Sequence, residues 1–231
     1  MSTDLQTVIL AAGPLQIRGT SAYTLRLAER LPQHGYSPVI VSPDISAYAG
    51  MIRPTCPVHE YMLLSSRFLR PLVNRLAAQD AAAHHPCLVH IQPRQALTFG
   101  LALARRRNLP CVVTIHDHDI SLPRTLTGGQ PRLKRLIAVS SSVRDSLVKE
   151  NTVDEALTTV IHSGVPVPDQ VDNSEVLGGR RIPVIGTAGR LEETKGFPYF
   201  IKAARTVQDN FAQDRGPEFV ELVKAIQAAA E

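Results

Sequence analysis

The sequence predicts an α/β fold built on a parallel β-sheet, and three observations support that prediction. Short apolar runs alternate with segments whose apolar residues keep helical spacing. The first run, Thr7–Ala12, leads into a loop that contains Gly13 and Gly19, and a helix comes next. The run Cys111–Ile115 is apolar almost throughout, as is typical of a central parallel strand buried on both faces. A strand, a glycine loop and a helix in this order form the first unit of a Rossmann-like domain.

The other elements of this first domain continue the same alternation. We expect five further strands, at Ser37–Val41, Val58–Leu64, Leu88–Ile91, Ile137–Val139 and Leu157–Ile161. Helices are expected between them, at 22–31, 66–83, 96–107 and up to about Lys149. A serine side chain can cap a helix by accepting a backbone N–H bond. Ser21 is therefore the expected cap of the first helix, and the serines at 140–142 are expected to cap the last.

The composition changes after Val165, where proline, aspartate and glycine residues cluster up to Arg181. Such a stretch is typical of a linker between domains. The segment after Arg181 has one recognisable strand and two helices, at Phe197–Phe211 and Glu218–Ala230, which are too few to close a sheet of their own. We therefore expect an N-terminal Rossmann-like domain at 1–166, a linker at 167–181 and a partial C-terminal domain at 182–231.

Composition restricts the class of protein. A chain of 231 residues with 44% hydrophobic content can bury a proper core. No apolar run approaches the roughly 20 residues that span a bilayer, and the N-terminus lacks a basic region followed by a long apolar core. We therefore expect a cytoplasmic protein. Cys56, Cys87 and Cys111 are widely spaced without a CxxC pair, which argues against a disulfide framework and a zinc knuckle.

The formal net charge of +4 invites an anionic partner. Cations cluster at Arg105–Arg107 and again at Arg132, Lys134 and Arg135. Aromatic residues make up only 5% of the chain, so few side chains can stack on nucleic-acid bases, and a nucleic-acid partner is disfavoured. A solvated basic face and a contact with an anionic membrane surface remain as interpretations.

A cationic turn lies late in the sequence, in residues 184–196 (VIGTAGRLEETKG). An apolar run gives way to Gly189 and Arg190, and Lys195 stands where a helix begins. A helix start offers unpaired N–H groups and a positive dipole end, which suit a phosphate, and Arg190 and Lys195 can grip a diphosphate from two sides. The ordinary alternative is a strand-to-helix turn with surface cations and no ligand.

The polar sequence HDHD, at residues 116–119, comes directly after the central strand. Open α/β sheets bind their ligands at the carboxyl ends of the strands. His116 and His118 alternate along the chain, so both can ligate a metal if an aspartate or a distant histidine completes the set. The ordinary alternative is a polar loop whose residues only bond one another.

The segment GRLEETKGFPYFIKAA, which starts at Gly189, resembles the opening of the C-terminal domain of glycosyltransferase family 4. Members of that family are retaining nucleotide-sugar transferases of the GT-B fold, and their pattern GRxxxxKG supplies the Arg and Lys that hold the donor's diphosphate. Four other segments match in the family's order: the glycine loop near the N-terminus, TIHD at 114–117, IAVSSSV at 137–143 and VIHSGVP at 160–166. Five ordered matches are more specific than any one of them.

The resemblance implies transfer of a hexose from a nucleotide-diphosphate sugar to a hydroxyl acceptor. Arg190 and Lys195 would hold the leaving diphosphate, and His116 would face and position the donor sugar. Gly13 and Gly19 would line the acceptor side of the cleft. No metal and no cofactor besides the donor is implied. The implied partners are the nucleotide sugar and a sugar or lipid-linked acceptor, with peripheral contact to the inner membrane face as a further expectation and no nucleic acid.

Three departures from the family pattern qualify this expectation. His162 or Ser163 stands where the family usually has Asn. No four-residue apolar run separates Phe211 from Gly216, where the family has another buried strand. The family's two glutamates eight residues apart, which hold the donor sugar and the ribose, are absent after residue 190. We therefore expect a truncated enzyme with impaired transfer. The alternative is a non-catalytic binding or regulatory module that retains only the acceptor-side domain.

Overall fold

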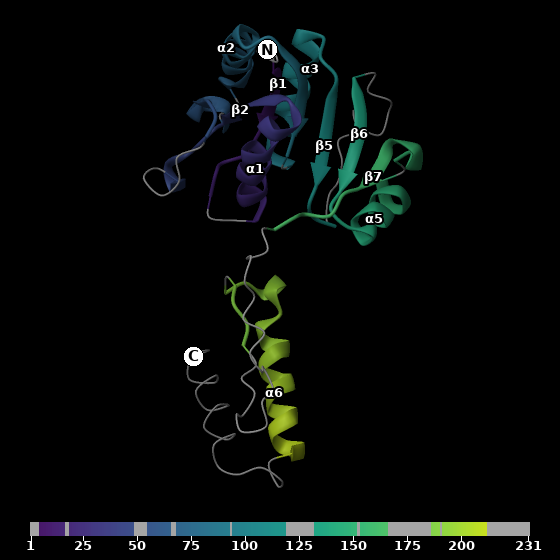
Figure 1. Ribbon diagram of the computed structural model, residues 1–231. Coiled ribbons are helices and arrows are strands. Elements are labelled where there is room, and N and C mark those ends of the chain that lie inside the picture. Colours follow the sequence, from purple (N-terminus) through teal and green to yellow (C-terminus); the bar gives the residue numbers. More distant parts are fainter. Residues whose placement is uncertain are drawn as a thin grey trace. The chain divides into compact units, whose positions relative to one another are not determined.

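The computed structural model describes residues 5–16, 19–48, 55–65, 68–92, 94–118, 132–151, 153–165, 186–189 and 191–211. The chain divides into two compact units, Met1–Val167 and Pro168–Glu231. The first unit is a sheet covered by helices (Figure 1). The described part of the second is a short 3-10 helix followed by one long α-helix.

Within the described residues, seven parallel strands form the sheet in the order β3-β2-β1-β4-β5-β6-β7. Their bounds are β1 Gln6–Ala11, β2 Tyr36–Ser42, β3 Val58–Glu60, β4 Pro86–Ile91, β5 Cys111–Ile115, β6 Leu133–Ala138 and β7 Thr158–Val160. The order reverses at β1, which pairs with both β2 and β4. Ligands of Rossmann-like sheets bind beside such a switch point, at the carboxyl ends of the strands. The predicted Rossmann-like parallel sheet is confirmed.

Helices connect the strands and cover the sheet. Their bounds are α1 Gly19–Arg30, α2 Arg70–Ala83, α3 Leu97–Arg107 and α5 Ser141–Asn151 in the first unit and α6 Phe197–Phe211 in the second. Short 3-10 helices lie at Leu31–His34, Ser46–Tyr48, Met62–Ser65, Arg94–Ala96, Glu155–Leu157 and Glu193–Lys195. None of the described helices is both long and apolar enough to cross a lipid bilayer.

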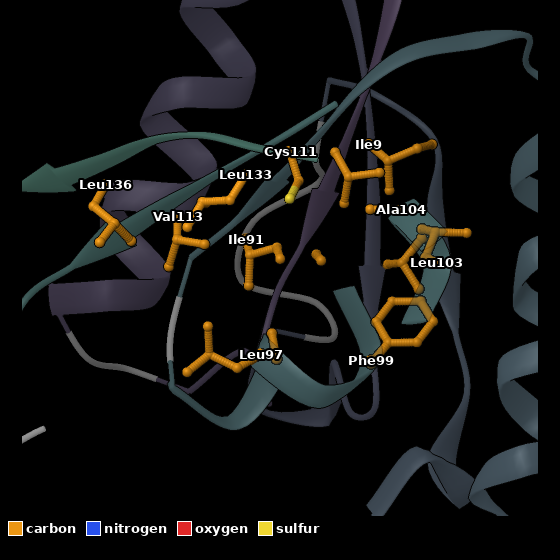
Figure 2. Packing of buried hydrophobic residues seen from close by; sticks show 14 of the residues in the cluster. Ile9, Ile91, Leu97, Phe99, Leu103, Ala104, Cys111, Val113, Leu133 and Leu136 are labelled. Atoms are coloured by element: carbon orange, nitrogen blue, oxygen red, sulfur yellow. The ribbon is translucent and has the colours of Figure 1, made fainter. Parts of the chain in front are cut away.

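The core consists of two apolar clusters, because successive residues of a strand point to opposite faces of the sheet. One cluster joins Val8 and Leu10 of β1 to Leu25 and Ala28 of α1. The larger cluster joins the alternate strand positions, such as Ile9, to residues of α2, α3 and α5. Figure 2 shows this larger cluster, in which strand residues lie over the α3 side chains of Leu97, Phe99 and Leu103.

Gly100 fixes how closely α3 packs on the sheet. A Cβ atom at this position would lie 2.5 Å from Cγ1 and 2.8 Å from Cδ1 of Ile91 in β4. It would also lie 3.3 Å from Cβ of Ala11 in β1. A larger residue fits this space only if the Ile91 side chain, the helix or β4 moves, so Gly100 permits the close approach of α3 to the centre of the sheet.

Strand β3 is shorter than predicted. The apolar pattern predicts a strand over Val58–Leu64, but only Val58–Glu60 pairs with the sheet. Its partner β2 ends at Ser42, which pairs with Glu60, so the next residues find no strand to bond. Tyr61 N donates a last bond to Ser42 O (2.9 Å), and the chain then turns into the 3-10 helix Met62–Ser65.

The two predicted serine caps have different outcomes. The prediction for Ser21 is wrong, because α1 begins two residues earlier at Gly19 and Ser21 lies inside it. Its Oγ instead accepts a bond from the N–H of Gln16 in the preceding loop (3.0 Å). The prediction for the later serines is confirmed at Ser140, whose Oγ accepts a bond from Val143 N in the first turn of α5 (3.2 Å).

In the second unit, α6 has the bounds that the helical spacing predicts, Phe197–Phe211. The 3-10 helix Glu193–Lys195 precedes it, and Gly196 separates the two with a φ of +71°, a left-handed conformation that suits glycine. The predicted strand includes Val184 and Ile185, which lie outside the described residues, as does the predicted helix over 218–230.

Candidate functional site

Three candidate site residues share the carboxyl edge of the sheet. Gly13 lies two residues after β1, Gln92 directly follows β4, and His116 directly follows β5. Because β1, β4 and β5 are consecutive neighbours in the sheet, these residues stand at the switch point. Gly13 and His116, two of the residues predicted from the sequence, are therefore at the edge where such sheets bind ligands.

The loop after β1 is held in place by bonds to neighbouring elements. Ser42 Oγ at the end of β2 donates to Gly13 O (2.9 Å), and Leu15 N donates to Asp44 O (2.7 Å). The bond from Gln16 N to Ser21 Oγ ties the far end of the loop to α1. We call the cavity enclosed there, of about 170 Å³, the glycine-loop pocket; its lining includes Gly13, Gln16, Thr20, Ser21, Thr24 and Gln95.

Gly13 and Gly19 have different positions relative to this pocket. Gly13 belongs to its lining. Gly19 is the first residue of α1, and a Cβ atom there would meet no other atom within 4 Å. The structure therefore places Gly13 on the wall of a cavity, whereas nothing in the described surroundings of Gly19 requires a glycine.

His116 is held in place by an aromatic neighbour. The ring of Tyr23, on α1, meets its imidazole edge-on, with centroids 4.9 Å apart and planes at 79°. Burial lowers the pKa of His116, and the nearby carboxylate of Asp117 opposes part of that shift. The imidazole is therefore neutral at pH 7. Its Nε2 atom is buried and has no hydrogen-bond partner among the described residues.

Gln92 is a candidate site residue that sequence reasoning missed. Its side chain is fully buried, and its Nε2 atom, like that of His116, has no hydrogen-bond partner in the described part of the chain. Its Oε1 atom lies 3.5 Å from Thr24 Oγ1, and Thr24 lines the glycine-loop pocket. The sequence feature that could have identified Gln92 is its position directly after a buried strand. His116 occupies the same position after the next strand along the chain.

A second buried histidine lies behind His116. His90 of β4 is hydrogen-bonded through Nε2 to Thr114 Oγ1 of β5 (2.7 Å). Burial, together with the neighbouring His116, lowers the pKa of His90 to about 4. Two neutral histidines and an amide thus lie side by side on β4 and β5, and none of them brings a full charge to the edge.

The metal interpretation of the HDHD sequence gains no support. His118 is exposed, and Asp119 lies outside the described residues. Within the residues that the structure describes, no three histidine, cysteine, aspartate or glutamate side chains form a group that could hold a metal ion.

The predicted diphosphate residues belong to the second unit. Lys195 is exposed at the end of the 3-10 helix, two residues before α6 begins, and its backbone N–H donates to Glu192 O (2.9 Å). The Cβ position of Gly189 lies 3.9 Å from Cγ of Lys195, so the glycine turn folds back against the lysine stem. Arg190 lies outside the described residues.

Comparison with known proteins decides the family. Residues 17–167, more than half of the chain, match the family model described as Glycosyltransferase Family 4. The chain belongs to glycosyltransferase family 4. This confirms the resemblance that the five ordered sequence segments carry. No curated protein sequence matches this family 4 chain.

Solved glycosyltransferases share the fold of this family 4 chain. A glycosyltransferase from Rickettsia africae ESF-5 has a TM-score of 0.71 and 18% identity over 98% of the chain. HepE (Alr3699) of Anabaena, solved with UDP-glucose, has a TM-score of 0.56 and 16% identity over 69% of the chain. MurG of Acinetobacter baumannii has a TM-score of 0.52 and 12% identity over 70%. At such identities the likeness establishes the fold.

The family 4 chain is shorter than these relatives. It spans 65% of the length of the Rickettsia glycosyltransferase, 44% of HepE and 47% of MurG. The Rossmann-like sheet of a GT-B glycosyltransferase, as predicted, is nevertheless fully formed in the first unit.

Proposed function

We propose that this family 4 chain serves in the transfer of a hexose from a nucleotide-diphosphate sugar to a hydroxyl acceptor. The observation that carries the proposal is the pair of buried, unpartnered nitrogens, His116 Nε2 and Gln92 Nε2, which have no partner within the described residues, at the switch-point edge. A buried polar atom without a partner costs about 1–3 kcal/mol, so two of them at a ligand edge fit a ligand that supplies polar atoms. Sugar hydroxyls, which donate and accept, suit both nitrogens.

The proposed roles derive from this chemistry. In the transfer, the bond between the anomeric carbon and the diphosphate oxygen breaks, and its electron pair stays on the diphosphate. The acceptor hydroxyl passes its proton to the departing diphosphate oxygen, and the acceptor oxygen forms the new bond to the anomeric carbon. Arg190 and Lys195 neutralise the charge that develops on the diphosphate. His116 positions the sugar, and Gly13 and Gly19 line the acceptor side; no metal or separate cofactor takes part.

The proposal also assigns roles to the parts of the chain. Residues 1–166 supply the acceptor side, 167–181 link the two parts, and 182–231 supply the donor's diphosphate contacts. HepE was solved with UDP-glucose, which supports a nucleotide sugar as the donor. We further propose a lipid-linked acceptor presented at an anionic membrane surface; a cytoplasmic location stays a prediction.

Donor binding tests the proposal more directly than turnover, because impaired transfer by this chain stays a prediction from the sequence. Calorimetry with a panel of uridine, guanosine and adenosine diphosphate sugars should show binding of at least one. Arg190→Ala and Lys195→Ala should each weaken it about tenfold or more, since a charge-assisted hydrogen bond contributes roughly 1.5–3 kcal/mol. Lys202→Ala is the matched control, because Lys202 is an exposed cation on α6 away from the turn.

Each outcome distinguishes the two candidate functions. Binding that both turn variants weaken and the control retains supports the transferase. Equal affinity in all four proteins removes the diphosphate site. A chain that binds a sugar or lipid-linked acceptor but no member of the nucleotide-sugar panel is the non-catalytic binding module instead.

A further inference from the structure

An exposed apolar surface lies on the first unit, formed by α2 and the turn before it. We call it the apolar ridge and define it as Met62, Phe68, Leu69, Leu72 and Leu76. Their exposed fractions are 75%, 90%, 43%, 58% and 47% in that order. Isolated exposed apolar residues are ordinary, but five of them within a stretch of 15 residues mark a surface that contacts something.

Two residues of the ridge, Leu72 and Leu76, lie on the outer face of α2, whose inner face is already packed. Val73, Ala77, Ala78 and Ala81 of α2 are buried in the larger core cluster. Leu69, Leu72 and Leu76 recur three and four residues apart, so they lie on one stripe along the helix. This stripe is separate from the stripe of buried residues, and α2 is therefore apolar on two faces, of which the core uses one.

Positive charge accompanies the ridge. Between Glu60 and Asp80 the sequence contains three arginines, Arg67, Arg70 and Arg75, and no acidic residue. The carboxylates at the two ends of this span, Glu60 and Asp80, each accept a bond from a neutral donor, Ile45 N (3.2 Å) and the Tyr61 hydroxyl, and keep their negative charge. The exposed side chain of Arg75 lies on the helix between Leu72 and Leu76.

The arginine end of α3 adds to this charge. Helices α2 and α3 pack against each other, and Figure 1 shows them side by side. The last residue of α3, Arg107, donates from Nε to Ala78 O of α2 (2.7 Å), which brings the end of α3 to the second half of α2. Arg105 and Arg106 are exposed at the same end. The basic cluster at 105–107 therefore lies beside the helix that carries the ridge.

We propose that the apolar ridge docks on an anionic lipid bilayer, with its leucine, phenylalanine and methionine side chains among the acyl chains and Arg75 at the phosphates. Apolar residues interspersed with arginine, in a span without an acidic residue between Glu60 and Asp80, are what an interfacial amphipathic helix requires. The inference extends the proposed membrane-presented acceptor by naming the surface involved. Its test contains no nucleotide, so it succeeds or fails independently of sugar transfer.

Vesicle sedimentation of the full chain tests the proposal. Vesicles of phosphatidylcholine with about one third phosphatidylglycerol should bind the protein at least fivefold more tightly than phosphatidylcholine alone, since each arginine near an anionic surface adds about 1 kcal/mol. Leu72→Gln with Leu76→Gln should weaken binding about tenfold or more. Arg75→Gln should weaken binding about fivefold to the anionic vesicles only. Leu5→Gln is the control, because Leu5 is 44% exposed outside the ridge.

A fluorescent reporter locates the contact directly. The chain contains no tryptophan, so Phe68→Trp introduces a single tryptophan on the ridge, which can be excited selectively over the five tyrosines. Its emission should shift to the blue with anionic vesicles and be quenched by brominated lipid chains. Unchanged emission, or equal vesicle binding by the double leucine variant, overturns the proposal. A wild-type dimer that the leucine substitutions dissociate, with no vesicle binding by either form, assigns the ridge to a second copy of the chain instead.

Discussion

The ring of Tyr23 on α1 meets the imidazole of His116, which comes directly after β5, edge-on at a centroid distance of 4.9 Å. The contact connects a helix at the switch point to a strand two places from β1 in the sheet. An edge contact of this kind restrains the rotation of the imidazole, because the edge of one ring prefers the face of the other. His116 is thereby oriented before any ligand arrives.

The Tyr23–His116 contact should be measurable as a coupling free energy. We expect Tyr23→Leu and His116→Gln to be non-additive in the free energy of unfolding by about 0.5–1.5 kcal/mol, the range for aromatic pairs. Tyr23→Phe keeps the ring and should keep the coupling, so it is the matched control. Urea unfolding of the single and double variants gives the value. Additive effects would show that the contact does not restrain the imidazole.

His90 should make the protein sensitive to acid. Its pKa falls from 6.5 to about 4 in the folded state, so the unfolded chain takes up the proton first as the pH falls. The stability that neutral His90 contributes is complete above pH 6.5 and is lost toward pH 4, a loss of about 3 kcal/mol. The lowered pKa of His116 acts in the same direction.

Urea unfolding between about pH 7 and pH 4 checks this expectation. His90→Gln removes the titrating group and leaves a side chain that can bond Thr114 Oγ1, so its stability should depend less steeply on pH in that window. His34→Gln is a control, because His34 ends a 3-10 helix in which no residue is buried. A slope that His90→Gln leaves unchanged would assign the acid sensitivity to other groups.

The sequence predicts the sheet well, because each of its central strands is a short apolar run that ends in a polar or turn residue. It places His116 at the carboxyl edge for the same reason. The length of β3 is not predictable from its own residues, since it depends on where β2 ends at Ser42. The first half of β6 is missed by the sequence prediction, because Lys134 and Arg135 are exposed and interrupt the apolar pattern.

The candidate site is only partly predictable for a similar reason. Gln92 is a single polar residue after a strand, and its burial depends on α1, which supplies Thr24. Tyr23 reaches His116 from a distant part of the sequence, and no periodicity encodes such a contact. The sequence predicts Ser21 as the cap of α1, but a serine near a helix start can equally bond the preceding loop, as it does with Gln16.

Gly100 should be intolerant of even one added carbon. We expect Gly100→Ala to lower the free energy of unfolding by about 1–3 kcal/mol, because its Cβ would overlap Ile91, although alanine favours a helix more than glycine does. Gly164→Ala is the matched control, since nothing lies within 4 Å of its Cβ position. Combining Gly100→Ala with Ile91→Val, which removes the crowding Cδ1 methyl but keeps a carbon at the closer Cγ1 position, should restore part of the loss. Full stability of Gly100→Ala would mean that α3 can move away freely.

Gln92 should separate stability from ligand binding. Its Nε2 atom is buried without a partner within the described residues, which costs about 1–3 kcal/mol in the unliganded protein. Gln92→Met keeps the volume and removes that polar atom, so we expect equal or greater resistance to urea. The same variant should bind a nucleotide sugar less tightly, because the ligand loses a hydrogen-bond partner.

Thr24→Val, which removes the hydroxyl that faces Gln92 Oε1 and leaves the amide in place, is the companion variant. Loss of stability in Gln92→Met with unchanged donor affinity would make Gln92 a structural residue of the core, and a gain of stability with weakened affinity would place it in the site.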